Sequence, residues 1–240
     1  AAFSGHMIDT GERKHPRFPE SAAAEAKERI REALDAEDVG IGYCSAACGA
    51  DILFIEALLE RGGEVNVVLP FKDDDFLDTS VAFAGEHWVQ RYRAVIDRVA
   101  VSRVTDEAYF GGDDIYRFLG KVIMGQAVLR GTELLSPPLL LTVLKADSEA
   151  LMGGAADVVE QWPFPSRHRN IDPTDLLGNR VRPEVRTAGK ERSTGRTKAT
   201  RSLPPGIHQA MKCILFADVV GYSKLQEEQT PFFMYEVLHS

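Results

Sequence analysis

Three glycine-containing segments of the sequence are candidates for binding an anionic group. They are residues 4–7 (Ser-Gly-His-Met), 45–51 (Ser-Ala-Ala-Cys-Gly-Ala-Asp) and 152–156 (Met-Gly-Gly-Ala-Ala). Because glycine has no Cβ, its backbone N–H can approach a ligand closely, and the first turn of a helix favours negative charge. Each segment alone is better explained by a tight strand-to-helix turn, but three together favour a phosphate or nucleotide pocket. The candidate backbone contacts are Gly5, Gly49, Gly153 and Gly154.

Side chains in and near these segments offer further chemistry. His6 either contacts a ligand or makes a local hydrogen bond. Asp51 falls in the first turn of an expected helix, where it either stabilises that turn or binds a ribose hydroxyl. Cys44 and Cys48 lack further Cys or His partners nearby, so we expect small buried thiols rather than a metal site. The loop after the first strand holds three basic residues, which either screen a bound polyphosphate or are solvated: Arg13, Lys14 and Arg17.

A second candidate site lies near the C-terminal end of the sequence. Residues 214–225 read Ile-Leu-Phe-Ala-Asp-Val-Val-Gly-Tyr-Ser-Lys-Leu, which is typical of an apolar strand followed by a glycine turn and a helix. A carboxylate at the edge of a strand can hold Mg²⁺, and such a turn presents N–H groups to triphosphate oxygens. Asp218 is therefore a candidate metal ligand. The alternative is a buried strand with one polar residue.

The three glycine-containing segments can form one pocket only if they follow strands that end at the same edge of a sheet. The pattern of apolar residues predicts such a sheet. We expect strands at residues 1–4, 39–43, 65–69, 101–104 and 139–144, separated by helices. Strands that alternate with helices predict an α/β fold with a Rossmann-like, doubly wound parallel sheet. No internal repeat is present.

The longest expected helix covers residues 114–134. Its apolar residues recur at spacings of three and four, so we expect one face to be buried against the sheet. The residues expected on that face are Phe118, Leu119, Val122, Ile123 and Leu129. A further helix is expected to begin at Gly153-Gly154 and to continue to Trp162.

Composition and charge exclude several classes of protein. Of the 240 residues, 44% are hydrophobic and 27% are charged, which is typical of a folded chain. Residues 180–201 hold eight Lys/Arg and two Glu, a local charge of +6 that leaves −14 for the rest of a chain with net charge −8. An acidic domain with a short basic linker is not typical of nucleic-acid binding. No apolar run reaches the roughly 20 residues that span a membrane, and three cysteines fit a reducing cytoplasm.

The first 172 residues resemble the SLOG superfamily. The resemblance is carried by Ser-Gly-His-Met-Ile-Asp at 4–9, Pro-Arg-Phe-Pro at 16–19, Cys-Gly-Ala-Asp-Ile-Leu-Phe at 48–54, Val-Leu-Pro-Phe at 68–71, and Gly153-Gly154. It implies a Rossmann-like domain that senses or processes nucleotides. Some members are phosphoribohydrolases that use a Gly-Gly-x-Gly-Thr-x-x-Glu loop.

This sequence departs from the hydrolase loop. Ala155 follows Gly154 where the family has threonine, and Val158 stands at the glutamate position. The loop therefore lacks both the hydroxyl and the carboxylate, which favours binding without hydrolysis. A phosphoribohydrolase-like activity of the first domain is the alternative function.

Residues 214–225 resemble the start of a class III adenylate/guanylate cyclase domain. The resemblance implies that Asp218 is the first metal-binding carboxylate, that Val219 binds the metal through its backbone, and that Mg²⁺ or Mn²⁺ is the cofactor. It covers only residues 212–240, so the second carboxylate and the base-recognising residues would follow Ser240. Two-metal chemistry needs both carboxylates, and we expect this piece alone to be inactive as a cyclase.

Together these features predict a cytoplasmic signalling protein with three parts: a SLOG-like sensor at 1–172, a basic flexible linker at 173–206, and the first part of a cyclase domain at 207–240. We expect the sensor to bind a nucleotide or nucleotide-derived ligand and to regulate a lyase that makes a cyclic nucleotide from ATP or GTP. The sequence begins with Ala1 rather than Met, so we expect a piece of a longer, homodimeric protein. A third possibility is an interaction module whose basic linker binds an acidic partner.

Overall fold

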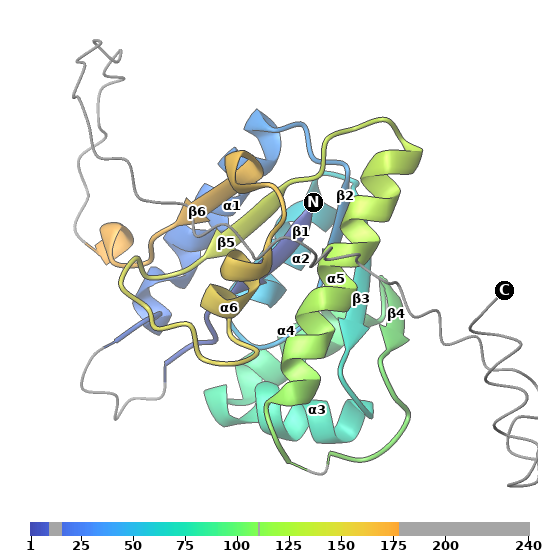
Figure 1. Ribbon diagram of the computed structural model, residues 1–240. Coiled ribbons are helices and arrows are strands. Elements are labelled where there is room, and N and C mark those ends of the chain that lie inside the picture. The colour runs from blue at the N-terminus through green and yellow to red at the C-terminus, as the bar shows by residue number, and fades with distance from the viewer. Residues whose placement is uncertain (10–15, 110, 178–240) are drawn as a thin grey trace, which may run out of the picture. The chain divides into compact units, whose positions relative to one another are not determined.

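Six short strands form one sheet in which every neighbouring pair is parallel (Figure 1). This is a computed structural model, and it describes residues 1–9, 16–109 and 111–177. The strand order is β4-β3-β2-β1-β5-β6, which confirms the α/β fold and the parallel sheet. The strands are β1 (Ala2–Gly5), β2 (Ile41–Cys44), β3 (Glu64–Leu69), β4 (Ala100–Arg103), β5 (Leu140–Val143) and β6 (His168–Ile171).

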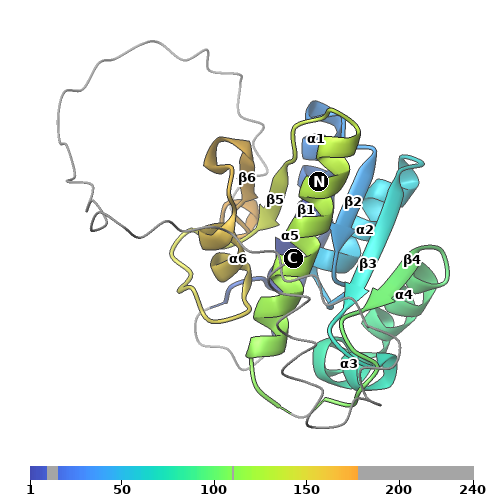
Figure 2. The same cartoon turned by 45° about the vertical axis from the view of Figure 1, so that its right-hand side comes forward.

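Helices cover both faces of this sheet. Helices α1, α2 and α4 lie on one face, and α5 and α6 lie on the other (Figures 1 and 2). The order of the strands reverses between β1 and β5, so the chain winds outward in both directions from the centre of the sheet. The α-helices are α1 (Ala23–Ala36), α2 (Ala50–Glu60), α3 (Asp73–Ser80), α4 (Glu86–Ile96), α5 (Asp114–Glu133) and α6 (Ala155–Gln161). Short 3-10 turns lie at η1 (Glu20–Ala22), η2 (Ala82–Ala84), η3 (Pro165–Arg167) and η4 (Asp175–Leu177).

The two faces of the sheet hold separate cores, because successive side chains of a strand point to opposite sides. Phe3 of β1 and Leu141 of β5 pack with the layer of α1, α2 and α4. Ala2 and Leu140, their sequence neighbours, pack with α5 and α6. All four residues of β5 are buried, the polar Thr142 included, as expected of a largely apolar strand at the centre of a parallel sheet.

Two elements were not predicted from the sequence, and one strand is displaced. Edge strand β6 has a polar sequence, His-Arg-Asn-Ile, and it is held by side chains: Thr142 Oγ1 donates to Asn170 Oδ1 at 2.8 Å. Helix α3 begins with three aspartates and has no apolar run to reveal it. Strand β2 begins at Ile41 rather than residue 39, because Val39 N–H donates to Leu34 O and so completes the end of α1.

The prediction for the buried face of α5 is wrong in part. Leu119 and Ile123 are buried as expected, but Phe118 is 54% exposed and Leu129 is 66% exposed. The sheet is instead covered by a neighbouring set of residues that includes Met124 and Ala127. Helix α5 has apolar residues around most of its circumference, so the spacing alone does not identify the side that faces the sheet.

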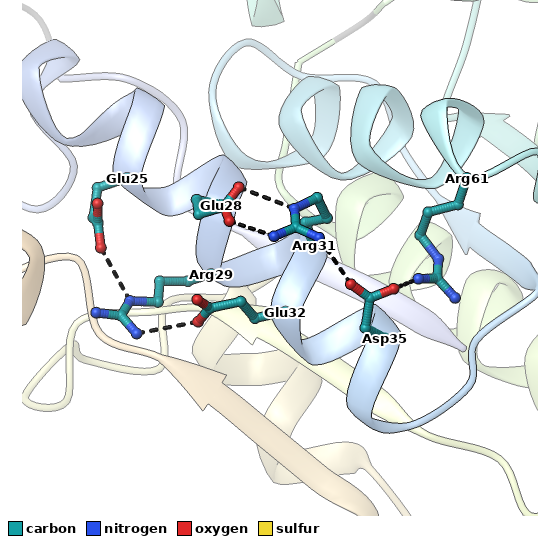
Figure 3. Close-up of polar contacts among 7 residues, drawn as sticks. All are labelled: Glu25, Glu28, Arg29, Arg31, Glu32, Asp35 and Arg61. Atoms are coloured by element: carbon teal, nitrogen blue, oxygen red, sulfur yellow. Dashed lines mark hydrogen bonds and ion pairs between the residues drawn. The ribbon is translucent and has the colours of Figure 1, made fainter. Parts of the chain in front are cut away.

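The solvent face of α1 carries two groups of ion pairs (Figure 3). In the first, Arg29 pairs with Glu25 and Glu32, each at 3.1 Å. In the second, Arg31 pairs with Asp35 at 3.0 Å and with Glu28, and Asp35 also pairs with Arg61, beyond the end of α2. Exposed pairs of this kind stabilise a helix only slightly. They mark a solvated face away from the strand ends. No helix within the described ranges has the length and apolarity needed to cross a membrane.

Candidate functional site

A cavity of about 380 Å³ lies at the ends of β1, β2 and β5, where the order of the strands reverses. Parallel α/β sheets bind ligands at such a point, and the volume lies within the roughly 300–1,000 Å³ typical of small-molecule sites. All three predicted segments contribute to its wall. The lining residues from these segments are Ser4, Gly5, His6, Met7, Ser45, Ala47, Asp51, Met152, Gly153, Gly154, Ala155 and Ala156.

The two glycines near β1 and α2 are explained by packing. A Cβ on Gly5 would lie 2.4 Å from Ala50 Cβ, so only glycine allows α2 to approach β1 this closely. Gly49 has φ +96°, and a Cβ there would lie 2.7 Å from the backbone nitrogen of Ile8. Gly5 lines the cavity, whereas Gly49 is not among the lining residues. Gly49 instead brings the start of α2 against the segment that follows β1.

His6 connects the segment after β1 to the loop after β5. Its side chain is buried at 7% exposure and lines the cavity. Lys145 N–H donates to His6 Nε2 at 3.2 Å, and Ser148 Oγ lies 3.1 Å from the same nitrogen. A ring nitrogen that accepts a hydrogen bond carries no proton, so the Lys145 contact fits the tautomer with its proton on Nδ1. Both partners lie more than a hundred residues from His6 in the sequence, so these are not the local contact that was the alternative, and the residue also faces the cavity.

Asp51 is a buried carboxyl group in the wall of the cavity. It is 7% exposed, and its Oδ2 accepts a hydrogen bond from Ala47 N–H at 3.2 Å. Burial raises the pKa of Asp51 to about 7, although the Ala47 N–H acts in the opposite direction. The group therefore exchanges its proton near neutral pH, and its protonated form offers a donor as well as an acceptor to a ligand.

The segment with two glycines is held against α5. Gly153 has φ +75°, and a Cβ there would lie 2.6 Å from Tyr116 Cβ. Its N–H donates to Asp157 Oδ2 at 3.0 Å, and the same carboxylate lies 3.4 Å from an Arg117 nitrogen. These contacts fix the backbone of residues 153–154 at the wall of the cavity. Val158 also lines the cavity and places an apolar side chain beside this segment.

The wall also holds Arg17, for which the sequence left contact with a polyphosphate open, Ser45 of the second predicted segment, and two residues that sequence reasoning did not assign. Arg17 lines the cavity, and its Nε is buried without a hydrogen-bond partner among the described residues. Ser45 Oγ is likewise buried and unpartnered within that part of the chain. Ser80 and Tyr116 reach the cavity from α3 and α5. No local signal identifies these two residues, because the fold alone brings their helices to the strand ends.

The charge of the cavity wall is mixed. Among the described lining residues, Arg17 is the single Arg or Lys, while Asp51, Asp113 and Glu149 carry carboxyl groups. A ligand that combines an anionic group with hydroxyl or amine donors would match this arrangement. A ligand made only of phosphates would meet more carboxylates than cations.

The two cysteines within the described residues are not chemically activated. Cys44 and Cys48 are buried and not in a disulfide, as expected. Burial raises the pKa of Cys48 to about 12 and raises the pKa of Cys44 well above its ordinary value. Both thiols are therefore neutral at physiological pH and act as small apolar side chains. In the ranges that the structure describes, no group of three or more His, Cys, Asp or Glu residues could hold a metal ion.

The second candidate site lies outside the described residues. This applies to Asp218 and Val219 and to the basic segment 180–201. Comparisons of the whole chain with protein-family models and with curated proteins find no match.

Proposed function

We propose that the domain described here is a sensor that binds a nucleotide or nucleotide-derived ligand in the cavity between β1 and β5. This binding would regulate a class III adenylate or guanylate cyclase domain, of which residues 207–240 would be the first part. The observation that carries the proposal is the position of the cavity. It lies where the order of the strands reverses, and all three glycine-containing segments contribute to its wall.

An anionic group of the ligand has a natural partner in Arg17. A buried N–H without a hydrogen-bond partner is unfavourable, and a phosphate oxygen placed beside Arg17 Nε would remove that cost. The unpartnered Ser45 hydroxyl offers a second polar contact. Asp51 and Glu149 are suited to hydroxyl or amine groups of a sugar or base.

Binding without hydrolysis is favoured by the side chains beside the two glycines. Ala155 and Val158 face the cavity and have no group that transfers a proton. Incubation of the chain with adenosine and guanosine monophosphates, followed by an assay for free base, tests this point. We expect no base above the level of a protein-free control, and steady base release would instead support the hydrolase.

Calorimetric titration tests the sensor itself. The panel consists of adenosine and guanosine mono-, di- and triphosphates added to wild type, Arg17→Ala and Arg29→Ala. Because hydrogen bonds to charged groups contribute about 1.5–3 kcal/mol, we expect Arg17→Ala to weaken binding by about 10- to 100-fold. Arg29 lies on the solvent face of α1, and its variant should bind as the wild type does. Absence of binding at millimolar nucleotide, or equal binding by all three proteins, would contradict the proposal.

The cyclase part of the proposal is supported by the motif at 214–225 and by the order of the domains. Asp218 and Val219 would hold Mg²⁺ or Mn²⁺, which would supply charge stabilisation at a triphosphate. The test uses the full-length protein and measures metal-dependent formation of cyclic nucleotide. We expect Asp218→Ala to abolish it. Retention of activity in that variant would remove Asp218 from the metal site.

A further inference from the structure

The backbone N–H groups of Gly153 and Gly154 are already used within the chain. Gly153 N–H donates to Asp157 Oδ2 at 3.0 Å, and Gly154 N–H donates to Leu151 O at 2.9 Å. The sequence predicted these two glycines as contacts of an anionic group. Because each N–H already has a partner, neither is free to hold a phosphate oxygen. The anionic group of a ligand must therefore find other partners in the cavity wall.

The opening of the cavity is apolar. Leu151 and Met152 line the cavity and are 60% and 46% exposed, and Met7, which also lines it, is 37% exposed. Leu151 and Met152 belong to the connection between β5 and α6, and Met7 follows β1 (Figure 1). We call these three side chains the apolar mouth. Single exposed apolar side chains are common on a protein surface, but three on the wall of one cavity offer a ligand a surface to cover.

The inner part of the wall is polar. Arg17, Ser45 and Asp51 line the cavity, and Arg17 Nε, Ser45 Oγ and the Asp51 side chain are buried. Ser45 directly follows β2, whereas the connection that holds Leu151 and Met152 follows β5, and β1 lies between these two strands. The cavity therefore offers polar partners at depth and apolar contacts at its opening.

Hydrogen bonds hold the connection between β5 and α6 in place. Leu151 N–H donates to Glu149 O at 2.9 Å, and Ser148 Oγ lies 3.1 Å from His6 Nε2. Lys145 N–H donates to the same ring nitrogen at 3.2 Å. A contact surface that is fixed before the ligand arrives loses less conformational entropy on binding. Glu149 also lines the cavity, two residues before Leu151, and its carboxylate disfavours an anion at this part of the wall.

We propose that a nucleotide binds in this cavity with its phosphate inside, beside Arg17 and Ser45, and with its base at the opening, against the apolar mouth. This inference rests on the proposed function, and it adds the orientation of the ligand and the residues that contact its base. The two faces of a nucleobase are apolar and aromatic, and a methionine thioether packs well against such a ring. The opposite orientation would bring the phosphate against apolar side chains and would leave Arg17 Nε without a partner among the described residues.

Calorimetric titration of Leu151→Ser and Met152→Ser tests which part of the nucleotide the apolar mouth contacts. The probes are the adenosine and guanosine phosphates of the panel above and ribose 5-phosphate, which has a phosphate and a sugar but no base and is measured by competition. Because each variant loses part of an apolar contact with the base, we expect it to weaken nucleotide binding by about 3- to 10-fold and to leave ribose 5-phosphate binding unchanged. Arg17→Ala is expected to weaken the binding of both kinds of probe.

Leu129→Ser is the matched control, because Leu129 has the same side chain as Leu151, is 66% exposed and is not among the residues that line the cavity. It should bind every probe as the wild type does. If none of the nucleotides binds to the wild type, the proposed function fails and this orientation fails with it. If nucleotides bind but their affinity is unchanged in Leu151→Ser and Met152→Ser, or if ribose 5-phosphate binding weakens as much as nucleotide binding, the orientation alone is overturned.

Photoaffinity labelling tests the orientation directly. 8-Azidoadenosine monophosphate carries its reactive group on the base, so illumination attaches it to residues that surround the base. Trypsin releases Leu151 and Met152 on the peptide 146–167 and Ser45 on the peptide 32–61. We expect the label on residues 146–167, and an excess of adenosine monophosphate should prevent it. A label on residues 32–61 instead would place the base beside Ser45 and refute the proposed orientation.

Discussion

Replacement of Asp51 by asparagine changes the pH dependence of stability in a way that the structure specifies. Burial raises the pKa of this carboxyl from its ordinary 3.8 to about 7. The folded state therefore holds a proton between these values that the unfolded state releases, and the contribution of Asp51 to stability decreases as pH rises from about 4 to 7. Above pH 7 both states are ionised and the loss is complete.

The magnitude follows from the same two pKa values. The gap between 3.8 and about 7 corresponds to about 4 kcal/mol, since one pKa unit is worth about 1.4 kcal/mol. Asparagine carries no charge, and its carbonyl oxygen can accept the hydrogen bond from Ala47 N–H. Asp51→Asn should therefore exceed wild type in free energy of unfolding by up to about 4 kcal/mol at pH 8. The difference should be close to zero at pH 4.

Urea unfolding followed by tryptophan fluorescence measures this difference, because Trp88 and Trp162 are both buried in the described domain. Measurements at half-unit intervals from pH 4 to 8.5 give the difference between variant and wild type, in which the titration of all other groups cancels. Asp78→Asn, at an exposed position on α3, is the control and should show no such trend. A difference that is independent of pH, or that favours wild type at pH 8, would refute the reasoning.

Three further predictions concern the site and the scaffold. Because the charged form of Asp51 repels an anionic ligand, nucleotide affinity measured by calorimetry should fall between pH 6 and 8 in wild type and change little in Asp51→Asn; equal pH profiles would contradict this. Gly153→Ala should lower the free energy of unfolding by about 1–3 kcal/mol, because φ is +75° and the new Cβ would clash with Tyr116; an unchanged urea midpoint would show that the loop can adjust. Glu56→Gln should lower the free energy of unfolding by about 1–3 kcal/mol at pH 7, because Arg91 donates two hydrogen bonds to this partly buried carboxylate. This loss of stability should become smaller below the lowered pKa of Glu56, because the wild-type carboxylate is then protonated as well.

The parts of the fold that follow local rules were predictable from the sequence. The largely apolar sequence of β5 predicted a central strand of a parallel sheet. The glycine turns at residues 5 and 153–154 predicted the position of two segments of the cavity wall. Strand β6 was not predictable, because its four residues are mostly polar and show no apolar pattern. Its position depends on pairing with β5 and on the hydrogen bond from Thr142 to Asn170.

The remaining wall of the cavity depends on contacts between distant segments. Ser80 and Tyr116 lie far from His6 in the sequence, and only the packing of α3 and α5 brings them to the same strand ends. The sequence also did not distinguish a glycine that lines the cavity from one that only allows close packing. Each glycine is required by a close approach near α2, yet only Gly5 lines the cavity.

Helix α5 explains why one of its faces was misjudged. Its inner side lines the cavity through Tyr116, Leu119 and Gly120, whereas Phe118 and Leu129 are exposed. A helix that forms part of a cavity wall and also covers a sheet has apolar residues over much of its circumference, so the usual amphipathic signal is lost. The side of α5 that borders the cavity therefore follows from the packing of the helix and not from the spacing of its apolar residues.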